Sequence, residues 1–268
     1  MPDTMHWAFV GDLQIPYHDP RAVTLWMDVM KWWRPKAIDF TGDIDDQLCY
    51  SSFSDGTTDE FFSIIKKAEN DSPMPYVKEQ AHEAKKFYED VRGSHKKADL
   101  HSSLGNHDVR INKYIDKKAP GYLDQITPEN MWGLDSLGIS WRTYDDVPFQ
   151  RYGDIYVHHG ATTTTTGLAV KSDIESYNIS LVRGHDHRGG VVYKTYPMTG
   201  RVLQGMGTGH MCNPKAYGLR YTINPSWELG FGIGHVYDNS QGIEEVKLDF
   251  VRITPDYTCV VDGKLFRG

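Results

Sequence analysis

The chain has 268 residues, of which 39% are hydrophobic and 24% charged, and this is the composition of an ordinary soluble globular protein with a substantial core. Its 29 lysines and arginines against 36 aspartates and glutamates give a net charge of −7, which excludes a general basic field for gripping long stretches of nucleic acid. The three cysteines are widely separated, so we expect no disulfide framework. We see no signal peptide and no apolar stretch near the ~20 residues of a membrane span, so we expect a cytoplasmic protein without a membrane partner.

Short apolar runs alternate with amphipathic stretches in the first half of the chain. The runs at 7–10, 37–40 and 100–104 are typical of buried strands. Four segments carry apolar residues at helical spacing, and they cover 20–33, 59–69, 75–92 and 109–118. An alternation of strand and helix indicates an α/β layered fold.

The second half of the chain is rich in strand-like runs and has few helices after residue 180. These runs lie at 155–157, 179–182, 202–203, 232–236 and 246–253. They predict a second sheet packed on the first, so the expected fold class is α/β (α+β), a two-sheet β-sandwich flanked by helices. No shift in composition marks a linker, and we expect a single domain over residues 1–268.

Five short polar motifs each begin where an apolar run stops. They are Asp12-Leu13-Gln14, Gly42-Asp43-Ile44-Asp45-Asp46, Gly105-Asn106-His107-Asp108, His158-His159-Gly160 and Gly184-His185-Asp186-His187. Loops converge at strand ends, and glycine beside a polar residue allows a sharp turn there. One such motif is a weak signal, since most are simply polar turns. Five in succession predict a shared cluster of Asp, Asn and His donors, which are ligands for Mn, Fe, Zn, Mg or Ni.

The order of these motifs resembles that of the calcineurin-like metallophosphoesterase family: D-x-H, GDxxD, GNH(D/E), H-G and GHxH. A looser resemblance, of Asn224-Pro225-Ser226-Trp227 and Gly230-Phe231, is to members common in bacteriophage genomes, which would place the chain in the host cytoplasm. The family's β-sandwich with flanking helices agrees with the fold expected above. By motif, the resemblance implies that Asp12 and His187 hold a first metal, that Asp43 bridges two metals, and that Asn106, His159 and His185 hold the second.

Phosphate-ester hydrolysis is the activity that the resemblance implies. Two divalent ions, Mn²⁺ foremost with Fe, Zn, Mg and Ni as alternatives, would clamp the phosphate and supply a bridging hydroxide. His107 would protonate the leaving oxygen or stabilise the phosphoryl oxygens, and Asp108 would hydrogen-bond to His107 and orient it. Asp46 is expected to support the Asp43 loop.

The substrate expected is a phosphate ester, nucleotides and nucleic acids included, with phosphodiesters preferred over monoesters. Gln47-Leu48 follows Asp46 where the protein-phosphatase branch of the family carries Arg-Gly, and this argues against that branch. The alternatives are a phosphomonoesterase, a DNA nuclease and, in a different class, a non-catalytic metal-binding interaction scaffold.

Gln14 departs from the family pattern, which has histidine two residues after the first aspartate. Its amide oxygen can still bind a metal, more weakly and as a harder ligand, which favours Mn, Mg or Fe over Zn at the first site. We expect direct ligation; the alternatives are a hydrogen bond to a metal-bound water and a loosely held first metal. His18 could substitute as the ligand, although capping the helix entry near Asp19-Pro20 is the simpler interpretation.

Several residues beside the motifs are candidates for contact with the site. Arg110 and Arg188 could bind a substrate phosphate, since guanidinium pairs well with phosphate oxygens, while a solvated arginine is the alternative for each. Trp227 is expected in the core, with packing against the site as the alternative. Residues 47–75 form an insertion that we expect to help shape the substrate cleft, the alternative being a surface excursion with a small core of its own. The threonines at 162–166 predict a loop beside the site.

Overall fold

Two β-sheets face each other in the structure, a computed structural model that describes residues 4–51, 73–164, 167–216, 219 and 226–268. Over these residues the first sheet has the strand order β11-β10-β1-β2-β3-β4, with β1 Met5–Val10, β2 Ala37–Phe40, β3 Asp99–Ser103, β4 Ile139–Arg142, β10 Gly230–Asp238 and β11 Glu244–Arg252. The second has the order β5-β6-β7-β9-β8, with β5 Phe149–Gln150, β6 Ile155–Val157, β7 Ser180–Arg183, β8 Gly189–Thr195 and β9 Val202–Thr208. A separate hairpin pairs β12 (Thr258–Val261) with β13 (Lys264–Arg267).

The direction of the strands decides where the polar motifs meet. Strands β1 to β4 run parallel in the first sheet, and β6, β7 and β9 run parallel in the second. Strands β10 and β11 are antiparallel additions at the edge of the first sheet. Because the carboxyl ends of parallel strands share one edge of a sheet, the loops that follow β1, β2, β3, β6 and β7 gather at one end of the sandwich.

The period-two alternation of β1 places its side chains on the two faces of the first sheet. Trp7 and Phe9 are fully buried between the sheets, where they pack in one cluster with Met206 of β9. Ala8 and Val10 point the other way and join the cluster beneath the helices. One strand therefore helps to fill both layers of the core.

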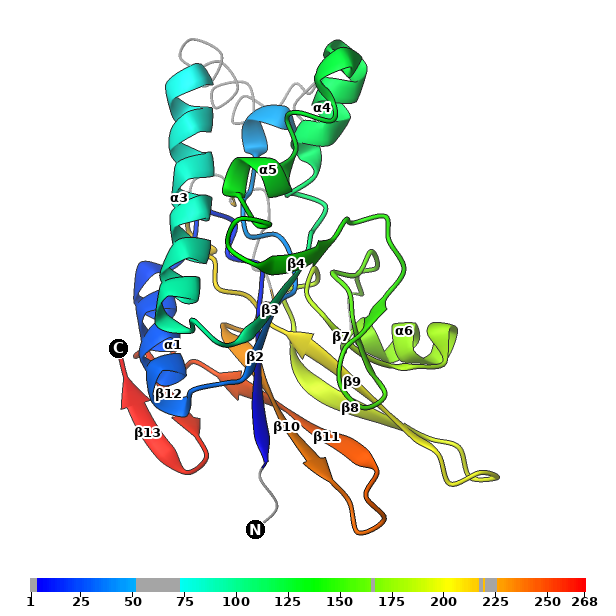
Figure 1. Cartoon of the computed structure of the whole chain (residues 1–268). Helices are drawn as coiled ribbons and strands as arrows, with labels where there is room; N and C mark the ends of the chain where they lie inside the picture. The colour runs from blue at the N-terminus through cyan, green and yellow to red at the C-terminus, as the bar shows by residue number, and fades with distance from the viewer. Residues whose placement is uncertain (1–3, 52–72, 165–166, 217–218, 220–225) are drawn as a thin grey trace.

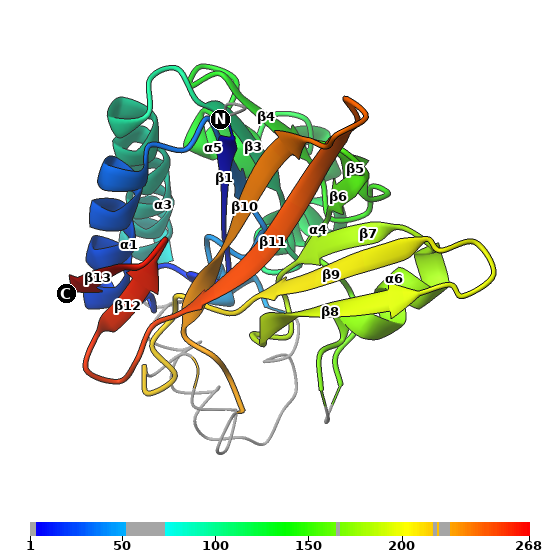
Figure 2. The ribbon, with the colours of Figure 1, turned by 90° about the horizontal axis from the view of Figure 1, so that it is seen from below.

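Helices cover the outer faces of both sheets. Over the described residues the α-helices are α1 (Pro20–Trp33), α3 (Pro73–Ser94), α4 (Arg110–Lys118), α5 (Pro128–Trp132) and α6 (Val170–Tyr177), with 3₁₀ turns η1 (Leu48–Tyr50) and η3 (Pro120–Tyr122). Figures 1 and 2 show α1 and α3 side by side against the first sheet, and α6 on the far side of the second. Asp19, and not His18, caps α1: its carboxylate accepts the N–H groups of Arg21 and Ala22.

The predicted fold class, a two-sheet sandwich flanked by helices, is confirmed. The helices expected at 20–33, 75–92 and 109–118 appear as α1, α3 and α4, while the helix expected at 59–69 and most of the 47–75 insertion lie outside the described residues. The structure adds elements that the sequence did not reveal, including α5, α6, β8 and the β12–β13 hairpin. No helix of the described residues has the length and apolar character that crossing a bilayer requires.

Candidate metal centre

Five strand ends bring the polar motifs together at one end of the sandwich. The loops after β1 and β2 are tied by backbone hydrogen bonds: Asp12 N–H donates to the Gly42 carbonyl, and Gln14 N–H donates to the Asp43 carbonyl, both over 2.9 Å. The loop after β7 joins them, because the His185 N–H donates to the Asp12 carboxylate. Backbone hydrogen bonds and the Asp12 carboxylate together therefore fix the relative positions of these loops.

Four donor atoms converge where the second metal was expected. His159 Nε2 lies 3.1 Å from Asn106 Oδ1 and 3.3 Å from Asp43 Oδ2. His185 Nδ1 lies 2.8 Å from Asn106 Oδ1 and 3.2 Å from His159 Nε2. The His159 Nδ1–H donates to the Thr41 carbonyl over 2.7 Å, which leaves the Nε2 lone pair for the cluster. A backbone carbonyl on the far nitrogen is the usual support of a metal-ligating histidine.

The first-metal residues lie beside this group. Asp12 Oδ1 is 3.2 Å from His187 Nε2, and Gln14 Nε2 is also 3.2 Å from His187 Nε2. The Gln14 side chain is buried, and its Oε1 has no hydrogen-bond partner among the described residues. Since the two ends of an amide are exchanged by a half-turn, the same rotamer can present this orphaned oxygen to the Asp12–His187 pair. The donor set thus suits a hard cation.

The backbone at these residues is held in an unfavourable conformation. Positive φ angles occur at Asp12 (51°), Gln14 (52°), Asp43 (51°), His185 (75°) and His187 (57°). Each left-handed non-glycine residue costs on the order of 1 kcal/mol, and such strain collects at functional sites. Its concentration in the predicted ligands indicates that side-chain placement, not local stability, has shaped these turns.

Two glycines allow the loops to approach. A Cβ on Gly42, whose φ is +91°, would lie 2.5 Å from the His159 Nδ1, and a Cβ on Gly105 would collide with the Asp43 carboxylate. Both positions therefore require glycine for a physical reason that goes beyond turn propensity.

Buried charge is concentrated in the cluster. Burial acts to lower the pKa of His159, but the adjacent Asp43 and Asp12 carboxylates outweigh it and raise the pKa to about 9. The pKa of Asp43 is held well below its usual range, because the charges of His159 and His107 outweigh the opposing effect of burial. Burial and the neighbouring His159 lower the pKa of His185 to about 3. Carboxylate and imidazole donors this close together are stabilised by a proton or a cation between them.

His107 is held by Asp46, and the prediction that Asp108 orients it is wrong. His107 Nδ1 lies 2.9 Å from Asp46 Oδ2, and both side chains are largely buried. The other nitrogen, Nε2, is 3.0 Å from Arg110 Nη2 and 3.9 Å from Asp43 Oδ2. Arg110 also donates to the Asp46 carbonyl and carboxylate. The imidazole therefore sits at the edge of the donor cluster, fixed by a carboxylate and a guanidinium.

Asp108 serves the backbone instead. Its carboxylate accepts the N–H groups of Asp45 and Gly105, over 2.9 and 2.7 Å. These bonds tie the loop after β2 to the loop after β3. The two Asp108 oxygens are therefore both engaged by the backbone. Asp46 was expected to support the Asp43 loop, and in the structure it is the residue that contacts the His107 ring.

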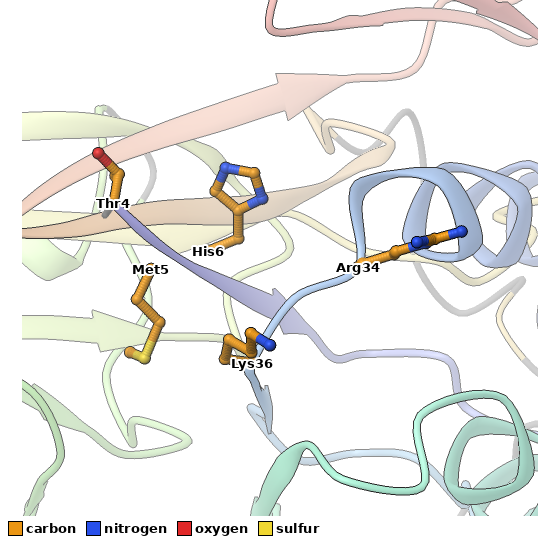
Figure 3. A pocket seen from close by; sticks show the side chains of 5 residues that line it. All are labelled: Thr4, Met5, His6, Arg34 and Lys36. Atoms are coloured by element: carbon orange, nitrogen blue, oxygen red, sulfur yellow. The ribbon is translucent and has the colours of Figure 1, made fainter. Parts of the chain in front are cut away.

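The site opens into a hollow of about 350 Å³. It is lined from the metal centre by Gln14, Asp43, His107, His185 and His187, and from the rim by Thr163, Thr164, Asp186, Arg188, Ser226 and Trp227. The threonine loop was expected beside the site, and its described members confirm this. Arg188 lines the hollow, whereas Arg110 approaches His107 from the side. A second hollow, of about 520 Å³, lies at the start of β1 and is lined by other residues (Figure 3).

Three residues behind the first metal position were not assigned to it from sequence. Trp227 lies edge-on to His187, with ring centroids 4.1 Å apart, so it packs against the site and not in the core. His210 stacks on His187 and is fully buried, and its Nδ1 is 3.3 Å from Cys212 Sγ. His210 and Cys212 lie in none of the motifs described above, and packing against the site was only the alternative for Trp227; the folded chain brings the three together.

Comparison with known proteins gives distant relatives. No protein-family model matches the chain. It is similar to the Gene 54 proteins of Mycobacterium phages D29 and L5, with 25% and 24% identity over 95% of this chain and 93% of each phage protein. Among solved structures it is similar to Vacuolar Protein Sorting 29 of Cryptosporidium parvum (15% identity, 98% and 94% of the two chains, TM-score 0.46). It is also similar to Yfce, a phosphoesterase from E. coli (13% identity, 91% and 98% of the two chains, TM-score 0.39).

Proposed function

We propose that this chain is a dinuclear metal-dependent phosphoesterase of the calcineurin-like kind, acting by preference on phosphodiesters. The observation that carries the proposal is the convergence of Asp43, Asn106, His159 and His185 on one buried point, with donor atoms 2.8 to 3.3 Å apart. Acceptors of this kind repel one another unless a proton or a metal ion lies between them. The raised pKa of His159 supports the proposal, because it reflects the negative charge that Asp43 and Asp12 place around this point.

The distances between donor atoms divide the proposed ligands into two groups, one for each ion. Asp43, Asn106, His159 and His185 would hold the second ion, and Asp12, His187 and Gln14 the first, with Asp43 as the bridging carboxylate that the family resemblance implies. Oxygen and imidazole donors without thiolate favour Mn²⁺, with Fe, Zn, Mg and Ni as alternatives. Cys212 stays behind His187, since its Sγ is 4.0 Å from His187 Nδ1.

Two divalent ions in such a site neutralise charge on the phosphoryl oxygens and lower the pKa of water to near neutrality. The residues of the chain do the rest. Asp46 accepts the Nδ1–H of His107 and fixes the ring, while Arg110 Nη2 donates to Nε2. Once the guanidinium turns to a phosphoryl oxygen, Nε2 can carry a proton and give it to the leaving oxygen. The Arg110 guanidinium beside Nε2 is placed to meet a phosphoryl oxygen. Arg188 would contact the substrate from the rim of the hollow.

The preference for diesters rests on the charge available around the hollow. A monoester dianion needs more positive charge than a diester, and the residue after Asp46 supplies none. That residue, Gln47, is buried, and its Oε1 accepts the Ile111 N–H over 2.9 Å at the start of α4. Its oxygen therefore holds the start of α4, and the side chain carries no charge to offer a phosphate.

The test is turnover of bis(p-nitrophenyl) phosphate, p-nitrophenyl phosphate and a single-stranded DNA by protein reconstituted with Mn²⁺. We expect the aryl diester to be hydrolysed fastest, and His107→Gln to lower kcat by roughly 10²–10⁴-fold with metal content unchanged. His82→Gln, at an exposed position on α3, is the matched control and should retain full activity.

Each other outcome selects an alternative. Faster turnover of the monoester or of DNA would replace the diesterase with a phosphomonoesterase or a nuclease. Two bound ions without turnover of any of the three would favour a non-catalytic metal-binding scaffold. Full activity in His107→Gln would refute the proposed role of that residue.

A further inference from the structure

A second group of ligand-type side chains lies at the opposite end of β1 from the metal centre. His6 and His235 are direct cross-strand partners in the antiparallel pair of β1 and β10. Asp262 joins them from the turn between β12 and β13. One ligand atom from each residue lies within 4.8 Å of the others. His6 precedes Asp12 by six residues along an extended strand, so the two sites are roughly 20 Å apart.

Trp33 at the end of α1 holds two of the three side chains in place. Its carbonyl accepts the Nδ1–H of His6 over 2.9 Å, and its indole lies flat on the His6 ring at 4.3 Å between centroids. The indole N–H donates to Asp262 Oδ2 over 2.7 Å. A backbone carbonyl on the far nitrogen of a histidine and a donor on the carboxylate are the contacts that orient metal ligands. Because Trp33 occupies His6 Nδ1 and Asp262 Oδ2, the atoms that remain for a ligand are His6 Nε2 and Asp262 Oδ1, and Oδ1 faces His235 Nε2.

Asp262 and His235 already meet at a ligand-to-ligand distance. Asp262 Oδ1 is 3.1 Å from His235 Nε2, and adjacent donors around a tetrahedral ion of 2.0–2.2 Å bond length are separated by about 3.3 Å. Asp262 has a φ of 47°, so its backbone is held in the left-handed region. Burial acts to raise its pKa, but the Trp33 indole and His235 lower it below the ordinary value, so the carboxyl is an anion at neutral pH.

The second hollow gives His6 of this group access to solvent. His6 lines it together with Thr4, Met5, Arg34 and Lys36 (Figure 3). In Figure 3 the Arg34 guanidinium points away from the His6 ring, and the Lys36 side chain lies on the other side of the β1 ribbon. Both cations are exposed, so water screens their repulsion of an ion at His6.

We propose that His6, His235 and Asp262 form a third metal site, which binds one zinc-type divalent ion with water in the fourth position. Two imidazoles and a carboxylate are a recognised zinc ligand set. Because the ligands come from β1, β10 and the C-terminal hairpin, the ion joins that hairpin to the first sheet. The site is separate from the proposed phosphoesterase centre and does not depend on it.

The test uses untagged full-length protein carrying His159→Ala, His185→Ala and His187→Ala, which removes all three histidine ligands of the proposed catalytic pair. After chelator stripping and dialysis against low-micromolar zinc, this background should retain about one equivalent of zinc. Adding His235→Gln or Asp262→Asn should remove that equivalent, whereas His82→Gln should leave it. Asp262→Asn keeps an acceptor for Trp33 and tolerates the left-handed turn, so it preserves the fold if His235→Gln does not.

Two further readouts separate ligation from a structural role. Co²⁺ should give the visible absorption of a tetrahedral site in the background and not in either substituted protein. Zinc should raise the Tm of the background alone. The proposal is overturned if the background binds no zinc, or if His235→Gln and Asp262→Asn bind as much zinc as the background does.

Discussion

Metal binding at neutral pH should release protons, and their number follows from the structure. In the metal-free protein the His159 imidazole carries a pKa of about 9 because Asp43 and Asp12 surround it. At pH 7 it is therefore protonated by roughly 100 to 1. His187 faces Asp12 in the same way, and its pKa is also raised well above the ordinary value, against the effect of burial. A metal ion binds only the neutral rings, so each ring must lose its proton.

The size of the effect can be worked out from these shifts. Displacing the His159 proton at pH 7 costs about 3 kcal/mol, since the pKa of about 9 lies roughly two units above the pH, and lowers the apparent affinity of the second site roughly 100-fold. Because the pKa of His159 is raised to about 9, protons compete with the metal for this ring below pH 9 and no longer do so above it. Apparent affinity should therefore rise about tenfold per pH unit for each proton between pH 6 and 8. His185, with a pKa of about 3, is already neutral and contributes nothing.

Calorimetry in buffers of different ionisation enthalpy measures this number directly. Filling both sites with Mn²⁺ at pH 7 should release about two protons, seen as the slope of observed enthalpy against buffer enthalpy. His107→Gln, which lies outside the ligand set, should give the same slope. A slope near zero at pH 7, with two ions bound, would refute the assignment of His159 and His187 as ligands.

Three further outcomes are expected. Asp46→Asn should lower kcat about 100-fold by releasing His107, with metal content by plasma emission unchanged; an equal loss in Asp116→Asn, an exposed residue on α4, would contradict the role. Asp108→Ala should lower the free energy of unfolding in urea by roughly 2 kcal/mol, because the backbone N–H groups that it accepts lose their partner; a change below 0.5 kcal/mol would contradict it. Gln14→His should tighten zinc binding at the first site, seen as added retention in dialysis; unchanged retention would show that Gln14 does not face a metal.

Much of the site could be predicted because its signals are local. Each ligand follows a short apolar run, and parallel strands carry their carboxyl ends to one edge. Gly42 and Gly105 beside the predicted ligands indicated sharp turns. In the structure the absence of a Cβ at these positions leaves room for the His159 and Asp43 side chains. Strand ends and the glycines beside them can therefore be recognised in the sequence before the fold is known.

Other features depend on distant parts of the chain and leave no local pattern. Asp46 and Asp108 both belong to the polar motifs, and Asp108 is next to His107 in the chain. Only the folded loops decide that Asp46, and not Asp108, contacts the His107 ring. The His6–His235 pair comes from the register of β1 on β10, which joins residues more than two hundred positions apart. Trp227 likewise reaches His187 only in the folded chain.

The account rests on a pair of ions held by these loops, and anomalous diffraction from crystals grown with Mn²⁺ tests it most directly. Data at the manganese edge should show two peaks roughly 3.5–4 Å apart, with the Asp43 carboxylate between them. One peak should lie among Asn106, His159 and His185, and the other between Asp12 and His187. No peak at either position, with Mn²⁺ in excess, would contradict the central claim.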